Sequence, residues 1–312
     1  LLFCGDRQQV LVQVMIQPME FSMRIRAIVF GLLFLVTSTV SADNWPNWRG
    51  PTLNGVAPKG TYPVNWSATK NVAWKIKLPG KGTSTPIIWN GQIILTSQEA
   101  GKNTTLAVDR SGKTVWKTTS GGPGVKGKHR KASGSNPSPV TDGKHIYVYF
   151  KNGDLVCLTL AGKAVWQTNL QKAWGKDTLW WDIGTSPVLS ADKVLVAVMQ
   201  TGGSYVAAFN KSDGKVAWKH DRNLEAPLEA AQSYTTPIVL KREGVERLLV
   251  RCEAVIVLPI GKLAPGMLEH GARGGPVDRP VDAVLAQLLE RGLKRSHAFQ
   301  RRQHLAVERR HR

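Results

Sequence analysis

The chain has 312 residues, 42% of them hydrophobic, and 11 Trp, which is enough for one sizeable domain with its own core. Its formal net charge of +20 would indicate a polyanion-binding protein if the charge were evenly spread. It is not, because residues 43–250 hold 21 Lys and 6 Arg, whereas residues 251–312 hold 2 Lys and 10 Arg. The three Cys (positions 4, 157 and 252) lack CxxC spacing, so the sequence predicts neither a disulfide framework nor a zinc site. Cys157 lies in a strand pattern and is expected to be buried and inert.

Residues 23–42, MRIRAIVFGLLFLVTSTVSA, have the basic start, apolar core and small-residue cleavage site of a secretory signal peptide. We therefore expect a mature start at Asp43 and a soluble secreted or periplasmic protein without a stable membrane span, a retained anchor being the alternative. Residue 43 is not Cys, so no lipid anchor is expected. We interpret residues 1–22 as upstream sequence from a mis-assigned start.

A repeat follows an irregular opening segment at residues 43–80, which is rich in Pro, Gly and Asn. Each unit begins with Ser-Pro or Thr-Pro, and the prolines at 86, 139, 187 and 237 are 53, 48 and 50 residues apart. An apolar run and then a β-rich segment come after each proline. The β-rich segments are residues 92–98, 145–151, 193–200 and 246–252.

Each of the first three units ends with a strand, a polar turn closed by Gly-Lys, and a second strand that carries one Trp. The three copies are TTLAVDRSGKTVWKTTS at 104–120, DLVCLTLAGKAVWQTNL at 154–170 and SYVAAFNKSDGKVAWKH at 204–220. The Gly is expected to give the turn a positive φ. We expect the repeat Trp residues to pack one unit on the next, with ligand stacking as the alternative. They are Trp116, Trp166, Trp218 and, in the partial copy NVAWKIKL at 71–78, Trp74.

Tandem units of four antiparallel strands are typical of a β-propeller. LAVDRSGKTVW resembles the repeat of pyrroloquinoline-quinone (PQQ) type propellers, a family of WD40/YVTN-like architecture. That family includes quinoprotein dehydrogenases and a propeller lipoprotein of the outer-membrane barrel assembly machinery. The opening NWPNWRGPTLNGV is similar to that of exported PQQ-like propellers common in planctomycete bacteria. The resemblance implies an all-β, incomplete propeller, with three four-stranded antiparallel blades and part of a fourth at residues 81–252.

The repeat fails in the fourth unit. EAVIVLPIGK at 253–262 fits a third strand and turn, but no Trp follows it. Residues 253–312 form an Arg- and His-rich tail, which we expect to be disordered or weakly helical. A genuine extension and a reading-frame change near Cys252 both account for the tail, and we favour the frame change, which would truncate a ring of seven or eight blades. Because unpaired blade faces are left exposed, we expect a larger ring or pairing with the chain itself or another chain.

The dehydrogenase members of the family carry a Cys-Cys disulfide over the quinone, acidic and amide calcium ligands, and a catalytic Asp. This chain has no Cys-Cys pair, and its Asp residues are scattered in turn contexts. We therefore expect neither PQQ nor calcium nor another metal, and we assign no catalytic residue.

A Gly-rich loop between the first two units, VKGKHRKASGS at 125–135, is a candidate polyanion site, with a merely solvated loop as the alternative. Its candidate contacts are Lys126, Lys128, Arg130 and Lys131.

The segment AWGKDTLWWDIGTSP at 173–187 leads into the third unit and is a candidate ligand site. Stacking rings beside a carboxylate suit a sugar or peptide, while packing beneath the neighbouring blade is the alternative. The candidate residues are Trp180, Trp181 and Asp182.

Three function classes follow. We favour an exported, non-catalytic binding or assembly scaffold with a protein or carbohydrate partner in the periplasm or envelope, and no specific nucleic acid. The rival is a fragment of a quinoprotein-type oxidoreductase whose site lies in missing blades. Polyanion binding through the basic tail is the third.

Overall fold

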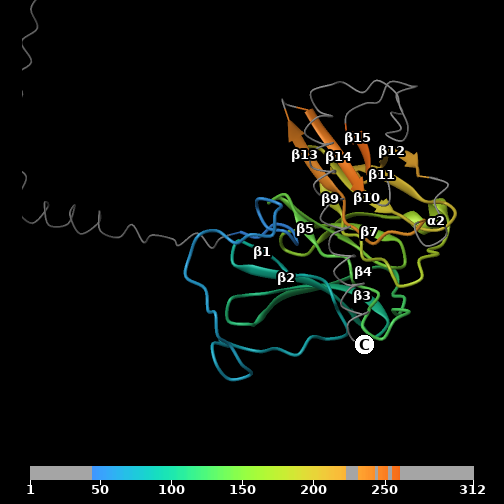
Figure 1. Cartoon of the computed structure of the whole chain (residues 1–312). Helices are drawn as coiled ribbons and strands as arrows, with labels where there is room; N and C mark the ends of the chain where they lie inside the picture. The colour runs from blue at the N-terminus through green and yellow to red at the C-terminus, as the bar shows by residue number, and fades with distance from the viewer. Residues whose placement is uncertain (1–43, 223–230, 243–244, 252–254, 261–312) are drawn as a thin grey trace, which may run out of the picture. The chain divides into compact units, whose positions relative to one another are not determined.

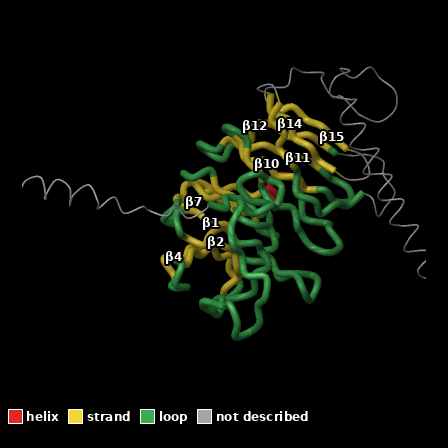
Figure 2. Tube along the Cα trace, turned by 60° about the vertical axis from the view of Figure 1, so that its left-hand side comes forward, coloured by secondary structure: helices red, strands yellow, loops and turns green. Residues whose placement is uncertain are grey.

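The computed structural model describes residues 44–222, 231–242, 245–251 and 255–260. The expected upstream segment at 1–22, the signal peptide at 23–42 and the tail beyond residue 260 lie outside these ranges. Within them the chain is almost entirely β, with one short helix, α2 (Leu170–Trp174), drawn in red in Figure 2. No helix in this part of the chain is long and apolar enough to cross a membrane.

The strands form four antiparallel sheets, and the order within each sheet follows the chain (Figure 1). The first sheet contains β1 (Ile87–Trp89), β2 (Gln92–Glu99), β3 (Lys102–Val108) and β4 (Thr114–Pro123). The second contains β5 (Val140–Thr141), β6 (His145–Tyr149), β7 (Asp154–Thr159) and β8 (Ala164–Asn169). The third contains β9 (Val188–Leu189), β10 (Lys193–Val198), β11 (Tyr205–Asn210) and β12 (Val216–Asp221).

The fourth sheet has three described strands, β13 (Ile238–Arg242), β14 (Val245–Arg251) and β15 (Val255–Pro259). β15 lies beyond residue 252, where we expected the blades to end, and it pairs with β14 along its whole length. Three four-stranded blades and part of a fourth are the architecture that the repeat predicted.

The sheets pack face to face through separate apolar cores. Ile146, Val148 and Phe150 of the second unit meet the first sheet at Ile87 and Ile94. A second core joins the second and third sheets, and a third joins the third and fourth sheets. The middle strands β6, β7, β10 and β11 are buried almost throughout because both of their faces are covered by neighbouring sheets.

The outer tryptophans of the first and second sheets, Trp116 and Trp166, each pack on the glycine turn of the next sheet. A Cβ at Gly162 would lie 2.4 Å from Trp116 Cε3, and one at Gly214 would lie 2.5 Å from Trp166 Cε3. Trp116 Nε1 donates to the carbonyl of Leu160 at 3.0 Å, in the same turn as Gly162. The glycines therefore have two functions, since they adopt positive φ and leave room for an indole from the neighbouring sheet.

A ladder of hydroxyl hydrogen bonds links the Ser-Pro and Thr-Pro segments of successive units. The backbone N–H of Thr85 donates to Ser138 Oγ at 2.9 Å, and that of Ser138 donates to Ser186 Oγ at 2.9 Å. The N–H of Ser186 donates in turn to Thr236 Oγ1 at 3.0 Å. The hydroxyl before the second, third and fourth repeat prolines thus satisfies a backbone donor of the preceding unit.

The opening segment is irregular, as its composition indicates, but it is tied to the inner strands. Trp45 exchanges backbone hydrogen bonds with Ile88 of β1 at 2.8 and 2.9 Å. The N–H of Thr141 in β5 donates to the carbonyl of Pro46 at 2.9 Å. Residues 45–46 therefore extend the inner edge of the first two sheets.

His220 on β12 is expected to make the fold acid-sensitive. Burial lowers the pKa of its imidazole below the ordinary value of 6.5, with Asp221 opposing, and its Nε2 is buried without a partner in the described part of the chain. The imidazole of His220 therefore binds a proton at a higher pH in the unfolded chain than in the folded chain. As a result, the free energy of unfolding begins to fall near pH 6.5 and continues to fall until the pH is below the pKa of the folded state. Urea unfolding at several pH values should show a shallower acid loss for His220→Gln, and an unchanged pH slope would contradict the prediction.

Candidate functional site

The two candidate surface segments meet at one place. Asp182 Oδ2 accepts hydrogen bonds from the backbone N–H of Lys128 at 2.8 Å and of His129 at 3.3 Å. Farther along the first loop, Asn136 Nδ2 donates to the carbonyl of Ile183 at 3.2 Å. We call residues 126–136 and 177–183 together the loop cluster. The basic loop and the aromatic loop, which the sequence presents as separate features, therefore form one surface.

A buried ion pair holds the loop cluster together. The side chains of Lys151 and Asp182 are 4% and 2% exposed, and Lys151 Nζ donates to Asp182 Oδ1. Burial lowers the pKa of Lys151, and the nearby carboxylate of Asp177 opposes that shift. Asp182 also has a φ of +133°, a conformation that L-residues rarely adopt. Because its carboxylate is committed to Lys151 and two backbone donors, Asp182 positions the loops and does not face solvent.

Trp180 and Trp181 project outward from this fixed backbone. Their side chains are 47% and 60% exposed. The N–H of Trp180 donates to Gln232 Oε1 at 3.0 Å, and that of Trp181 donates to Tyr234 Oη at 3.4 Å. The Trp181 ring meets the His129 ring edge to face, with centroids 5.7 Å apart. The two indoles are therefore exposed while the chain that carries them is tethered.

Exposed cationic side chains belong to the same loop cluster as the indoles, and that of Lys131 lines a hollow with Trp181. Lys128 Nζ donates to the carbonyl of Leu179, which commits that ammonium to the loop cluster. Lys126, Arg130 and Lys131 form no ion pair within the described residues. Asp182 is neutralised by Lys151, and the charged side chains that residues 126–131 expose are cationic.

The loop cluster contains a shallow hollow. The lining residues are Thr83, His129, Lys131, Ala132, Asn136, Trp181 and Asp182. Thr83 Oγ1 donates to Asn136 Oδ1 at 2.5 Å, so the first unit also contributes to this surface.

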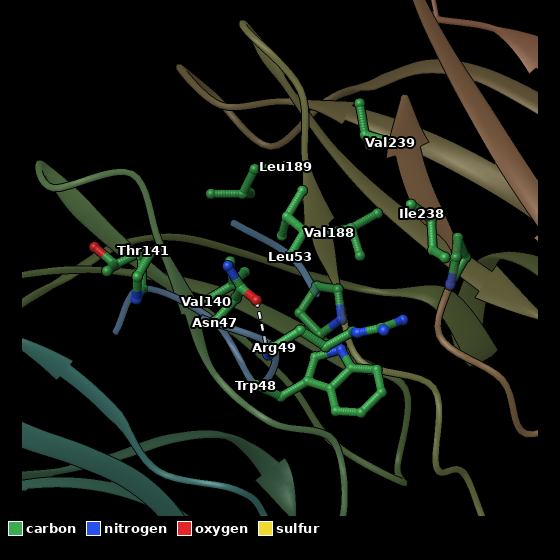
Figure 3. Close-up of a pocket in the computed structure, with 13 residues that line it drawn as sticks. Asn47, Trp48, Arg49, Leu53, Val140, Thr141, Val188, Leu189, Ile238 and Val239 are labelled. Carbon is green, nitrogen blue, oxygen red and sulfur yellow. Dashed lines mark hydrogen bonds between the residues drawn. The ribbon is translucent and has the colours of Figure 1, made fainter. Parts of the chain in front are cut away.

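A second, apolar pocket of about 130 Å³ lies between the opening segment and the inner strands (Figure 3). An apolar cavity of about 150 Å³ accepts benzene, so this one has room for about one apolar side chain. The N–H of Arg49 donates to Asn47 Oδ1 at 2.9 Å, which shapes the loop at the pocket mouth. The inner strands of the second, third and fourth sheets contribute the apolar residues that follow their repeat prolines: Val140, Val188, Leu189, Ile238 and Val239.

One cysteine lies among the described residues. Cys157 is buried in β7, and burial raises the pKa of its thiol to about 12, which keeps it protonated and unreactive. No group of three or more His, Cys, Asp or Glu in the described ranges is arranged to hold a metal ion.

Some residues of the site were missed by sequence reasoning. Lys151 ends the β-rich segment HIYVYFK, where a terminal lysine normally faces solvent, and Gln232 and Tyr234 lie some fifty residues beyond the indoles they tether. The spacing of the repeat was the available signal, because equivalent positions in successive units lie side by side.

Sheet order, face-to-face packing and the tryptophan–glycine contacts define a β-propeller protein of PQQ-like repeats. The family model described as outer membrane protein assembly factor BamB matches residues 57–198 and, in an overlapping second match, residues 101–263. These matches cover more than half of the chain, which therefore belongs to this family.

Several solved structures resemble the chain. The quinohemoprotein alcohol dehydrogenase from Comamonas testosteroni is 17% identical, with a TM-score of 0.43, over 63% of this chain and 30% of its own. BamB from Moraxella catarrhalis is 15% identical, with a TM-score of 0.34, over 62% of this chain and 65% of its own. The chain thus spans less than two thirds of either protein. Comparison with curated proteins gave no match.

Proposed function

We propose that the chain is a non-catalytic binding or assembly scaffold that contacts a protein partner of the cell envelope through Trp180 and Trp181. The observation that carries the proposal is the exposure of both indoles on a tethered backbone. Exposed tryptophans that are already fixed in place lose little conformational entropy on binding. Tryptophan is also among the residues most enriched at the energetic centres of protein interfaces.

The family supports a protein partner and an envelope location, since its description is that of an outer membrane protein assembly factor. The signal-peptide pattern at residues 23–42 supports export. A scaffold needs no catalytic group, which agrees with the commitment of Asp182 to Lys151.

The charge of the loop cluster specifies the chemistry of the partner segment. Lys126, Arg130 and Lys131 are exposed in the same loop cluster as the indoles, and Lys131 lines the hollow together with Trp181, so an acidic segment with an apolar side chain is the complementary ligand. Apolar contact with Trp181 would supply affinity, and the basic side chains would speed association at low salt.

Trp181→Ala is expected to weaken partner binding tenfold or more without changing the fold. Truncating a central tryptophan typically costs about 2 kcal/mol or more of binding energy, and the side chain is 60% exposed, so its loss leaves the core intact. A photoreactive side chain at position 181 of the full exported chain should cross-link to an envelope protein in the producing cell. Co-purification of that protein with the Trp181→Ala variant measures the loss.

Trp66 provides the matched control, because it is an 80% exposed tryptophan of the opening segment, outside the loop cluster. Trp66→Ala should retain wild-type binding, and a photoreactive group there should not capture the same protein. Equal losses in the two variants, or cross-links only to polysaccharide, would overturn the protein-scaffold proposal. Quinone absorbance and dye reduction after addition of PQQ and calcium would instead favour the oxidoreductase.

A further inference from the structure

The apolar pocket beside the opening segment shares no lining residue with the loop cluster, so it is a second candidate site. Its apolar wall comes from the inner strands of three consecutive sheets (Figure 3). Val140 of the second sheet is buried, whereas its counterparts in the third and fourth sheets are only half-buried. The third and fourth sheets therefore keep apolar surface facing the cavity, which a ligand could remove from water. The half-buried residues are Val188, Leu189, Ile238 and Val239.

The loop at the pocket mouth is held in place by its own backbone. The N–H of Gly50 donates to the carbonyl of Asn47 at 2.9 Å, and that of Gly55 donates to the carbonyl of Arg49 at 2.8 Å. A Cβ at Gly50 would lie 2.7 Å from Trp45 Cη2, so the loop closes tightly on the Trp45 indole. Because Trp45 is itself paired with β1, the backbone of Arg49 is positioned before any ligand binds.

Arg49 alone is charged among the described residues that line the pocket. Its guanidinium carbon lies 5.4 Å from the centroid of the Trp48 ring, which holds the cation beside an aromatic face. Its Nη2 donates a long hydrogen bond of 3.4 Å to the carbonyl of Asn54, and within the described ranges it forms no ion pair. A guanidinium presents five N–H donors in a planar fork that matches the two oxygens of a carboxylate.

We propose that this pocket binds a small monocarboxylic acid, whose single aromatic or branched apolar group lies among the inner strands while its carboxylate pairs with Arg49. The volume of about 130 Å³ sets the size of that group, since an apolar cavity of about 150 Å³ accepts benzene. Apolar walls with one fixed polar group are the usual pattern of a small-molecule site.

The lining also selects against other ligands. A hydrocarbon would cover the guanidinium of Arg49 without pairing it, and a dicarboxylate would bring a second charge against Val188 and Ile238. An acid with one carboxylate and one apolar group avoids both costs.

Benzoate tests the proposal, with benzamide as a neutral analogue of nearly the same size and shape. Titration of the full exported chain with isotope-labelled methyl groups should give saturable shifts at Val188, Leu189 and Val239. Benzoate should bind about tenfold or more tightly than benzamide, because only the carboxylate offers Arg49 two charged acceptors. Arg49→Met should weaken benzoate binding by about tenfold or more and leave the benzamide affinity within about twofold.

Lys59→Met is the matched charge control, because Lys59 is an exposed cation of the same opening segment and does not line the pocket. It should bind benzoate as the wild type does. Trp181→Ala should also retain benzoate binding, so this proposal and the scaffold proposal fail separately. Equal affinities for benzoate and benzamide, methyl shifts elsewhere, no saturable binding, or equal losses in Lys59→Met and Arg49→Met would each overturn the assignment.

Discussion

Replacing Gly162 with Ala is expected to lower the free energy of unfolding by about 3 kcal/mol or more. The φ of Gly162 is +80°, which costs an L-residue about 1–2 kcal/mol. The new Cβ would also lie 2.4 Å from Trp116 Cε3, so the indole must move and give up its 3.0 Å hydrogen bond to Leu160. Losing part of a buried aromatic contact adds about 2 kcal/mol. Urea unfolding followed by tryptophan fluorescence measures the change.

Gly101 separates the backbone cost from the packing cost. It also has positive φ, at +73°, but nothing lies within 4 Å of a Cβ built there. Gly101→Ala should therefore cost only about 1 kcal/mol. In a Trp116→Ala background, the cost of Gly162→Ala should fall towards that value, since the indole is gone and only Thr118 Oγ1, at 2.9 Å, still lies close to the new Cβ. Equal costs for the two glycines in the wild-type background would contradict the two functions assigned to Gly162.

The repeat made the sheets predictable, because local pattern and local structure coincide there. Four strands per unit follow from β-branched runs between turn residues, and positive φ at the Gly of Gly-Lys follows from turn chemistry. The docking of Trp116 on Gly162 is different, because its two residues lie 46 positions apart. No local rule places an indole on a turn of the next unit. The repeat Trp and the Gly-Lys turn recur with the same period, however, and that shared period is consistent with the contact.

The candidate site was predicted in pieces. Exposed indoles and a basic loop could be recognised from residue types, but their contact through Asp182 depends on how three units stack. A carboxylate beside two tryptophans suggested a ligand contact, whereas its ion pair with Lys151 makes it a positioning group. The sequence could not show this, because Lys151 follows β6 whereas Asp182 lies in the loop that leads into the third unit, 31 residues away.

Lys151→Met is expected to lower the free energy of unfolding by about 3–5 kcal/mol, the cost of removing one partner of a buried ion pair. The Asp182 carboxylate would remain buried, with only the N–H groups of Lys128 and His129 to compensate it. Because those bonds hold the loop cluster, cross-linking at position 181 should also fall, even at temperatures where the variant is still folded. Urea unfolding and the cross-linking yield measure the two effects.

The double variant Lys151→Met/Asp182→Asn should recover most of the lost stability, because the Asn side-chain oxygen can still accept from both backbone donors and no buried charge is left. Lys117→Met is the matched single change at an exposed pair, since Lys117 and Glu99 are 44% and 34% exposed and 2.7 Å apart. That substitution should cost less than about 1 kcal/mol. If Lys151→Met cost no more than Lys117→Met, or if the double variant were as unstable as the single one, the ion pair would not be what holds Trp180 and Trp181 in place.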